Sequence, residues 1–434
     1  MGNDSGQGRA PAARPALALV ASQVIGQLAL AAVIPVLTRA YPPAELGVYQ
    51  IAFAIAFIVL PVATLRLEYV VPTTHSPALV TRRLRLGLGT ATALGAAALL
   101  GGLIAGATGA GDAAGILVMS GLLIPALGLP LLDGARLIRR GARRALAVRN
   151  LVGGVAGASL QAVFALTGGD VLLLPVALLV GRLIGILASR FVTDAAAPGP
   201  AADAEERDER YTLARAAPTI GAGVLAGATI QGLTVIAGAT LGTGAAGQAG
   251  VAQRIASAPI ALAGQALTQT TQLEFSRIIR DRRPELARSL AAHVRVFLLA
   301  GAAVGLALAV GGPLLAGPVL GEQWAPAGIL IAMLALPAAL QVAVSPTDFL
   351  FVMLRRERML LALQGARAGL TWSAGLIAAA LTGDLAVITL CFSVAWAASY
   401  AGSLIFVTRA ARRFDRQHAP AGAAGRMPAA TRSR

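Results

Sequence analysis

Long apolar runs alternate with short polar breaks along most of the chain. Each run approaches the roughly 20 residues that an α-helix needs to cross a bilayer. The runs cover residues 17–38, 46–65, 86–106, 113–132, 151–167, 171–188, 216–241, 247–268, 296–315, 327–344, 359–381 and 385–407. This pattern predicts an all-α integral membrane protein with twelve transmembrane helices, arranged as two six-helix bundles around a central cavity.

The polar segments divide the chain into five predicted parts. These are a cytoplasmic tail (1–15), a first six-helix bundle (16–192), a cytoplasmic linker (193–214), a second six-helix bundle (215–408) and a disordered basic tail (409–434). The first apolar run is longer than a signal-peptide core and lacks a cleavage site. We therefore expect it to be retained as a span.

Composition excludes several classes of protein. Of the 434 residues, 56% are hydrophobic and 13% are charged, which is too little charge for the surface of a soluble domain. The sequence contains no Lys, which excludes a Walker A loop and a pyridoxal Schiff base. The single cysteine, Cys391, excludes a disulfide or paired-cysteine metal site within the chain. The three histidines lack metalloprotease spacing, so we expect neither a metal nor a cofactor.

Arginine is concentrated in alternate loops of the twelve-span arrangement. One set of loops and both tails hold nearly all loop arginines, whereas the other set holds Arg39 alone and several acidic residues. The positive-inside rule then predicts a multi-pass protein of the cytoplasmic (inner or plasma) membrane with both termini in the cytoplasm. The net charge of +16 is explained by orientation, and we expect no nucleic-acid partner.

A faint internal repeat relates the two halves. Residues 45–48 recur as 245–248, Pro61 is matched by Pro259, and residues 67–69 resemble 273–275. Because each half has an even number of spans, an axis along the membrane normal can relate them. We expect substrate to bind where the halves meet.

Intramembrane arginines are the main candidates for substrate contact, since a charge deep in a bilayer normally faces a cavity or a partner. Arg182, Arg254 and Arg367 lie near the centre of their predicted spans, and Arg39 and Arg66 lie nearer the ends. We identify no carboxylate at comparable depth, because three nearby acidic residues fall close to the cytoplasmic ends of their spans: Glu68, Asp133 and Asp348. The predicted cavity is therefore cationic.

Glutamines provide further candidate donors. On a helix, Gln265 and Gln272 fall within about 20° of Arg254, with Gln269 beside them. The first span adds two more candidates, Gln23 and Gln27. All of these glutamines either face the cavity or form hydrogen bonds between packed helices, and the sequence leaves both possibilities open.

Three motifs together resemble a known family. They are Thr38-Arg39 followed by Pro42, Gly47 and Tyr49; Arg66 followed by Glu68-Tyr69; and Ala252-Gln253-Arg254 followed by Pro259. The chain resembles bacterial oligosaccharide flippases, the Wzx-like polysaccharide-biosynthesis branch of the MOP superfamily that also contains MATE exporters and lipid II flippases. The resemblance implies a MATE-like fold and a non-enzymatic, alternating-access flippase for surface polysaccharide biosynthesis. Its cargo would be a polyprenyl-diphosphate-linked glycan, and its partners membrane lipids and other polysaccharide-assembly proteins.

Three alternatives are less consistent with the residues. A MATE-type exporter of cationic drugs needs intramembrane carboxylates, which we do not find at midplane depth. A lipid II flippase shares the fold but commonly has two further spans. A membrane polymerase or ligase for polysaccharides usually needs a large outer loop, whereas every predicted outer loop here is short.

Overall fold

The computed structural model describes residues 22, 25, 26, 28–74, 76–193, 213–354 and 356–418. Within these ranges, the side chains of residues 73, 214–215, 261–270, 272–273, 346 and 352 are not described. The described residues form helices and turns and include no strand, as expected for apolar segments that must satisfy their backbone hydrogen bonds inside a bilayer.

The first half contains six long or moderately long helical elements and two short turns after α3. The elements are α2 (Ile34–Ala40), α3 (Pro43–Thr64), α4 (Leu67–Val70), η1 (Val71–Thr73), α5 (Pro77–Ala107), α6 (Gly111–Arg139), α7 (Arg143–Leu166) and α8 (Leu173–Arg190). The described helical residues preceding α2 extend it back to Leu28 as one apolar helix.

The second half repeats this arrangement with more interruptions. Its elements are α9 (Leu213–Leu241), α10 (Thr243–Arg280), α11 (Leu286–Leu315), η3 (Ala316–Leu320), η4 (Glu322–Trp324), α12 (Ala325–Met333), α13 (Ala335–Val344), η5 (Ser345–Thr347), α14 (Phe349–Met353), α15 (Glu357–Thr382) and α16 (Leu385–His418). The pair α12 and α13 bends by 46° at Leu334.

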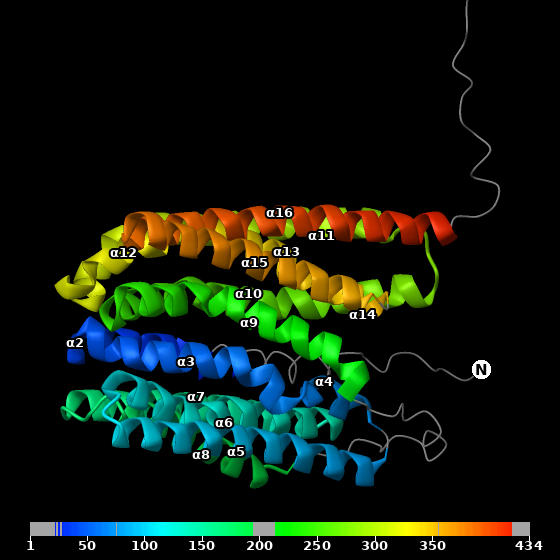
Figure 1. Cartoon of the computed structure of the whole chain (residues 1–434). Coiled ribbons are helices and arrows are strands. Elements are labelled where there is room, and N and C mark those ends of the chain that lie inside the picture. Colours follow the sequence, from blue (N-terminus) through cyan, green and yellow to red (C-terminus); the bar gives the residue numbers. More distant parts are fainter. Residues whose placement is uncertain are drawn as a thin grey trace, which may run out of the picture.

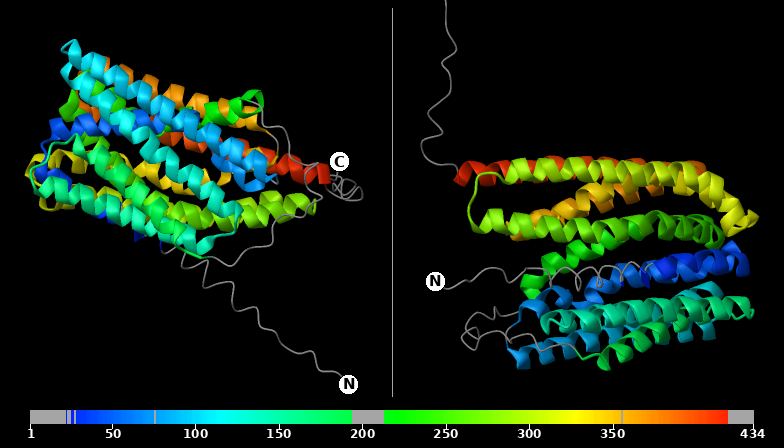
Figure 2. Two further views of the ribbon diagram at one scale, coloured as in Figure 1. Left: turned by 90° about the horizontal axis from the view of Figure 1, so that it is seen from below. Right: turned by 180° about the vertical axis from the view of Figure 1, so that it is seen from behind.

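The helices form two bundles that lie side by side along their whole length. In Figure 1 the first half, coloured blue to teal, lies below the second half, coloured green to red, and the view from behind shows the same division (Figure 2, right). One buried apolar core is formed mainly by the first bundle and includes four residues of the second, Val251, Ala316, Leu320 and Trp324; another lies within the second bundle. The predicted all-α, two-bundle architecture is therefore confirmed.

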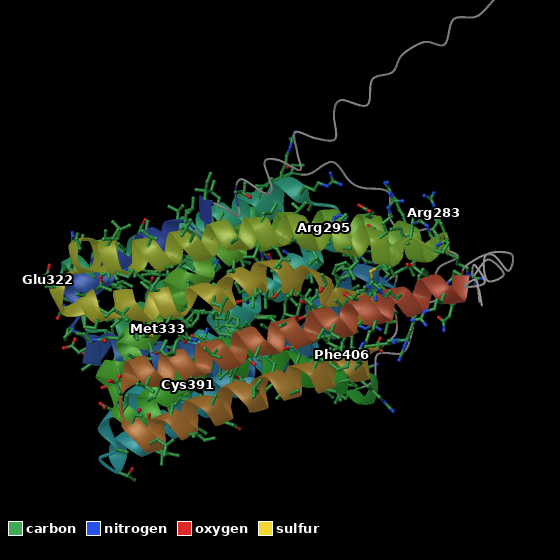
Figure 3. All side chains as sticks on the ribbon, turned by 90° about the horizontal axis from the view of Figure 1, so that it is seen from above. Arg283, Arg295, Glu322, Met333, Cys391 and Phe406 are labelled. Carbon is green, nitrogen blue, oxygen red and sulfur yellow. The ribbon has the colours of Figure 1, made fainter. Side chains whose placement is uncertain are left out.

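The two ends of the molecule differ in charge. Arg283 and Glu322 lie at opposite ends (Figure 3). We call the end with the α6–α7 and α10–α11 turns and His418 the arginine-rich end, and the end with the α5–α6, α7–α8, η3–α12 and α15–α16 turns the acidic end. The alternation of loops predicted from arginine content agrees with this chain path.

The count of twelve spans is not confirmed. Among the described residues, eight helices are long and apolar enough to cross a membrane, or nine if the bent α12–α13 pair is one span. The helices α10 and α15 run alongside these (Figure 1) but carry more polar and charged residues. We predicted a disordered tail from Arg409 onward. This prediction is wrong for residues 409–418, because α16 continues to His418.

Helices α3 and α10 join the halves through a close backbone contact near the acidic end. A Cβ at Gly47 would overlap the Thr243 carbonyl oxygen, and a Cβ at Gly247 would overlap the Pro43 carbonyl oxygen. Each glycine thus packs against the residue four positions before the other. This reciprocity is what a twofold axis along the membrane normal produces, and it agrees with the repeat detected in the sequence.

Candidate substrate-binding site

Arg254 crosses from the second half to the aromatic side chains of the first. Its guanidinium carbon lies 5.4 Å from the Tyr49 ring centroid and 4.7 Å from the Phe53 ring centroid. The two rings are one turn apart on α3, with centroids 6.4 Å apart, so they present a continuous aromatic surface. This contact is a cation–π interaction between the two bundles.

The residue before Arg254 fixes the rotation of α10. The Gln253 amide nitrogen donates to the Ile230 carbonyl at 2.6 Å, and its oxygen accepts from the Thr234 hydroxyl at 2.5 Å. Both partners lie on α9 in the same half. Because Gln253 is held against α9, the next side chain along the helix is turned toward the first half.

Arg182 approaches the same aromatic residue from within the first half. Its guanidinium interacts electrostatically with the Tyr49 phenol, and its buried Nε has no hydrogen-bond partner among the described residues. At 1.5 Å rise per residue, Arg182 lies about 14 Å and Arg254 about 17 Å from the acidic ends of their helices. Both arginines therefore lie well inside their helices, and their depth in the bilayer stays a prediction.

Neither of these arginines has an acidic neighbour in the described part of the chain. No carboxylate oxygen there lies within 4.0 Å of either guanidinium. Glu68 and Asp133 pair instead with Arg66 and Arg136, at 3.5 Å and 2.6 Å. Within this part of the chain, one guanidinium without a carboxylate partner thus stacks on Tyr49 from the second half, and another, in the first half, lies within electrostatic range of the same residue.

Arg367 corrects the expectation that no carboxylate pairs with the deep arginines. One of its terminal nitrogens lies 3.8 Å from Asp348 and donates to the Gln364 amide oxygen at 3.1 Å, and the other donates to the Ser403 hydroxyl at 2.8 Å. Its guanidinium also stacks 4.1 Å from the Tyr400 ring centroid. The broken segment after α13 carries Asp348 back to this position, so Arg367 belongs to a structural network.

Arg39 lies at the acidic end, where it joins the two halves. It donates to the Pro318 carbonyl of η3 at 2.9 Å. Beside it, the Thr38 carbonyl accepts hydrogen bonds from the Trp324 indole at 2.6 Å and from the Gln323 amide at 3.2 Å. We call these contacts of Thr38, Arg39, Pro318, Gln323 and Trp324 the acidic-end closure.

The acidic-end closure follows from the proline after α2. In a continuing helix, the Thr38 carbonyl would accept from the backbone nitrogen of residue 42, but Pro42 has no N–H group. The indole and amide of the second half supply the missing donors, and Trp324 is fully buried in doing so. The sequence motif therefore leaves the Thr38 carbonyl without a donor in its own helix, and side chains of the second half supply the hydrogen bonds.

Arg66 lies at the opposite end of α3, where the backbone breaks. Leu65 and Arg66 both adopt left-handed conformations, with φ of 52° and 54°. The Arg66 guanidinium pairs with Glu68, and a Cβ at Gly223 of α9 would overlap it. Arg66 therefore contacts the second half near the arginine-rich end and is remote from the Tyr49 site.

The predicted glutamines lie outside what the structure describes. Gln23 and Gln27 fall outside the described residues, and the side chains of Gln265, Gln269 and Gln272 are not described. Their assignment to the site stays a prediction. Two residues of the site were not candidate contacts in the sequence: Tyr49, which appears there only as a motif residue, and Gln161, a buried side chain of α7 whose amide nitrogen lies 3.1 Å from the Tyr49 hydroxyl.

Comparison with solved structures shows the fold. A multidrug resistance MATE family transporter of the MOP superfamily, in an inward-facing conformation, matches with a TM-score of 0.60 and 15% identity over 92% of this chain and 94% of that one. The lipid II flippase MurJ, in an inward closed conformation, matches with a TM-score of 0.64 and 11% identity over 93% and 90%. A MATE structure in a straight conformation gives 0.60 and 13% over 93% and 96%.

Sequence comparison identifies the family. No curated protein sequence matches the chain significantly. A family model described as "Polysaccharide biosynthesis protein" matches residues 36–328, which include α3, the Tyr49 site and the whole of the acidic-end closure. The match covers more than half of the chain, and the solved structures share its helical architecture. The chain is therefore a multi-pass membrane protein that belongs to the polysaccharide biosynthesis protein family.

Proposed function

We propose that the protein is a flippase for a polyprenyl-diphosphate-linked oligosaccharide and works by alternating access. One observation carries this proposal: Arg254 stacks on Tyr49 from the second half, Arg182 of the first half lies within electrostatic range of Tyr49, and neither arginine has a carboxylate partner in the described structure. Family membership and the MATE-like fold support transport in polysaccharide assembly. The transport step itself requires no catalytic residue.

The chemistry of the site favours an anionic cargo. Insertion of an arginine at the centre of a membrane helix costs about 2.5–3.5 kcal/mol. A cation–π contact recovers about 0.5–2 kcal/mol of that for Arg254, which leaves a deficit that an anion can offset. A diphosphate suits two guanidinium groups, because each planar fork can hold two phosphate oxygens.

The contacts between halves fit an alternating mechanism. The acidic-end closure and the glycine contact seal the two bundles at one end. We place the acidic end on the outer face and the arginine-rich end, with both termini, in the cytoplasm. In this orientation the structure is closed toward the outside, and cargo enters from the cytoplasmic leaflet.

The competing functions differ in the charge or in the head group of their cargo. A cationic drug would be repelled by two unpaired arginines, whereas the diphosphate of lipid II would be attracted like that of an oligosaccharide carrier. The unpaired arginines therefore favour a flippase for an anionic cargo over an exporter of cations. The two flippases differ in the sugar that their lipid carrier bears.

Loss of the gene tests the proposed function. In a strain without a second flippase of this class, deletion should cause lipid-linked oligosaccharide to accumulate in the cytoplasmic leaflet and surface polysaccharide to fall. Complementation with the wild-type gene is the control. Unchanged surface polysaccharide together with accumulation of lipid II would assign the protein to cell-wall assembly, and unchanged levels of both would refute the proposal.

A further inference from the structure

The Tyr49 hydroxyl accepts a hydrogen bond but has no acceptor of its own among the described residues. The Gln161 amide nitrogen lies 3.1 Å from the phenol oxygen, and the ring is fully buried on α3. A phenol has one hydrogen to donate besides its accepting lone pairs. A buried donor without an acceptor is unfavourable, so the hydroxyl hydrogen is available to an acceptor that the described residues do not provide.

The second contact of Gln161 fixes which way its amide is turned. The same amide nitrogen lies 3.2 Å from the Leu174 carbonyl of α8. A carbonyl oxygen only accepts, so the group facing it must be the NH2. The other hydrogen of that NH2 then points at Tyr49, and the phenol oxygen is the acceptor in this pair. Gln161 therefore directs the phenol hydrogen away from itself.

Three donors belong to this site in the part of the chain that the structure describes. The Arg182 and Arg254 guanidinium groups donate only, and the Tyr49 hydroxyl retains one hydrogen. We propose that Tyr49 donates a hydrogen bond to an anionic oxygen of the bound cargo, between Arg182 and Arg254, and that Gln161 is the residue that positions it. This assignment rests on the proposed function, since it adds a donor to the same site.

The distribution of these residues between the halves explains how cargo reaches a buried hydroxyl. Tyr49, Gln161 and Arg182 all belong to the first half, while Arg254, which covers the ring, belongs to the second. Movement of the second half carries Arg254 off the aromatic surface and leaves the other three in place. The hydroxyl is then uncovered beside Arg182, and Arg254 completes the site from the second half when the halves close on the cargo.

Binding of a short polyprenyl diphosphate tests the assignment. Purified full-length protein in detergent is titrated calorimetrically with geranylgeranyl diphosphate, with geranylgeraniol as the uncharged comparison. Tyr49→Phe keeps the ring beneath Arg254 but removes the hydroxyl, and we expect its Kd to rise about ten- to a hundredfold. Tyr41→Phe is the matched control, because the Tyr41 hydroxyl donates to the Gly169 carbonyl at 2.9 Å, at the acidic end. Its Kd should not change.

The arginine variants distinguish a failure of the Tyr49 assignment from a failure of the proposed function. If Arg182→Ala and Arg254→Ala weaken binding but Tyr49→Phe does not, the assignment of Tyr49 is refuted and the proposed function stands. If the wild type fails to bind the diphosphate, or all variants bind as the wild type does, both the proposed function and the assignment of Tyr49 are refuted.

Gln161 is tested through its coupling to Tyr49. Gln161→Leu should raise the Kd, and the double variant with Tyr49→Phe should bind no more weakly than Tyr49→Phe alone, because Gln161 acts through the hydroxyl. Additive losses would refute the positioning role. If Tyr49→Phe does not fold, 3-fluorotyrosine introduced at position 49 gives a second readout. Its fluorine resonance should shift with the diphosphate and not with geranylgeraniol, and no shift would refute the contact.

Discussion

Arg254 and Arg367 are both deep arginines stacked on aromatic rings, yet their surroundings give them different roles. Arg367 is buried with a carboxylate, an amide and a hydroxyl around it. Arg254 is partly buried, and its contacts in the described structure are with the rings of Tyr49 and Phe53. The Arg367 Nε is buried without a hydrogen-bond partner among the described residues, but both terminal nitrogens are held by internal groups. A guanidinium paired with an internal carboxylate stabilises the fold, whereas one without an anion is available to cargo.

Arg254→Ala should reduce transport at least tenfold and leave the melting temperature nearly unchanged. The side chain makes no hydrogen bond in the described structure, so its loss removes cargo binding and little internal stabilisation. Arg254→Lys should restore only part of the transport, because an ammonium lacks the planar fork. Flipping of lipid-linked oligosaccharide in proteoliposomes and thermal unfolding in detergent measure the two effects. A folded, fully active Arg254→Ala protein would remove Arg254 from the mechanism.

Arg367→Ala should behave in the opposite way and lower the melting temperature. Its removal leaves Asp348 half-buried without its cation, and loss of one partner of a buried pair costs about 3–5 kcal/mol. Adding Asp348→Asn should recover part of the loss, since the neutral amide no longer needs a counter-charge. The measurement is thermal unfolding of the single and double variants. Equal stability of all of them would contradict the structural role.

For single residues, the sequence predicts the presence of a deep arginine better than it predicts the partner of that arginine. Arg182 and Arg254 stand out because an arginine in an apolar run needs an explanation. The partner of Arg367 was not predictable, because Asp348 follows a proline-containing break whose path depends on tertiary packing. Tyr49 was visible as a motif residue, but its central position depends on the crossing of α3 with α10, which no local pattern specifies.

Helices α3 and α10 meet through glycines, so the closeness of their contact depends on the absence of side chains. The backbone at Gly47 touches Thr243, and that at Gly247 touches Pro43. The acidic-end closure lies beyond this crossing and needs the bundles to stay close. The two features therefore act together at the acidic end.

Gly47→Ala should favour opening at the acidic end, because the added Cβ would overlap the Thr243 carbonyl oxygen. In a Cys391→Ala background, a cysteine at position 38 reports opening, since Thr38 is fully buried here. Gly47→Ala should raise its labelling by an impermeant maleimide severalfold. Gly89→Ala is the control, because a Cβ there meets nothing within 4 Å. Equal labelling of both variants would refute the role of the contact.

Most of the helices were predictable, because each apolar run is long and bounded by Pro, Gly or Arg. Their ends were less so: α5 begins at Pro77, well before the predicted run at 86, since its first turns carry arginines that favour helix and reach toward the head groups. The π-helical turn of η3 and the bend at Leu334 were not predicted. Such irregularities depend on contacts with other helices, including those of the acidic-end closure.

For the whole molecule, the charge difference between the ends gives a test of orientation. In a Cys391→Ala background, single cysteines at positions 112 and 322 should react with an impermeant thiol reagent added to intact cells. Cysteines at 140 and 283 should react only after permeabilisation. Positions 283 and 322 lie at opposite ends (Figure 3), so they are the decisive pair. Labelling of 283 but not 322 in intact cells would invert the proposed topology.

The proline that leaves the Thr38 carbonyl without a helical donor also makes the movement of the bundles depend on water. When the acidic-end closure opens, the Thr38 and Pro318 carbonyls and the Trp324, Gln323 and Arg39 donors all lose their partners. Backbone groups do not stay unpaired, so water must replace each contact. Opening is thus a hydration step, and osmolytes that are excluded from the protein surface should hold this end shut by lowering the activity of water.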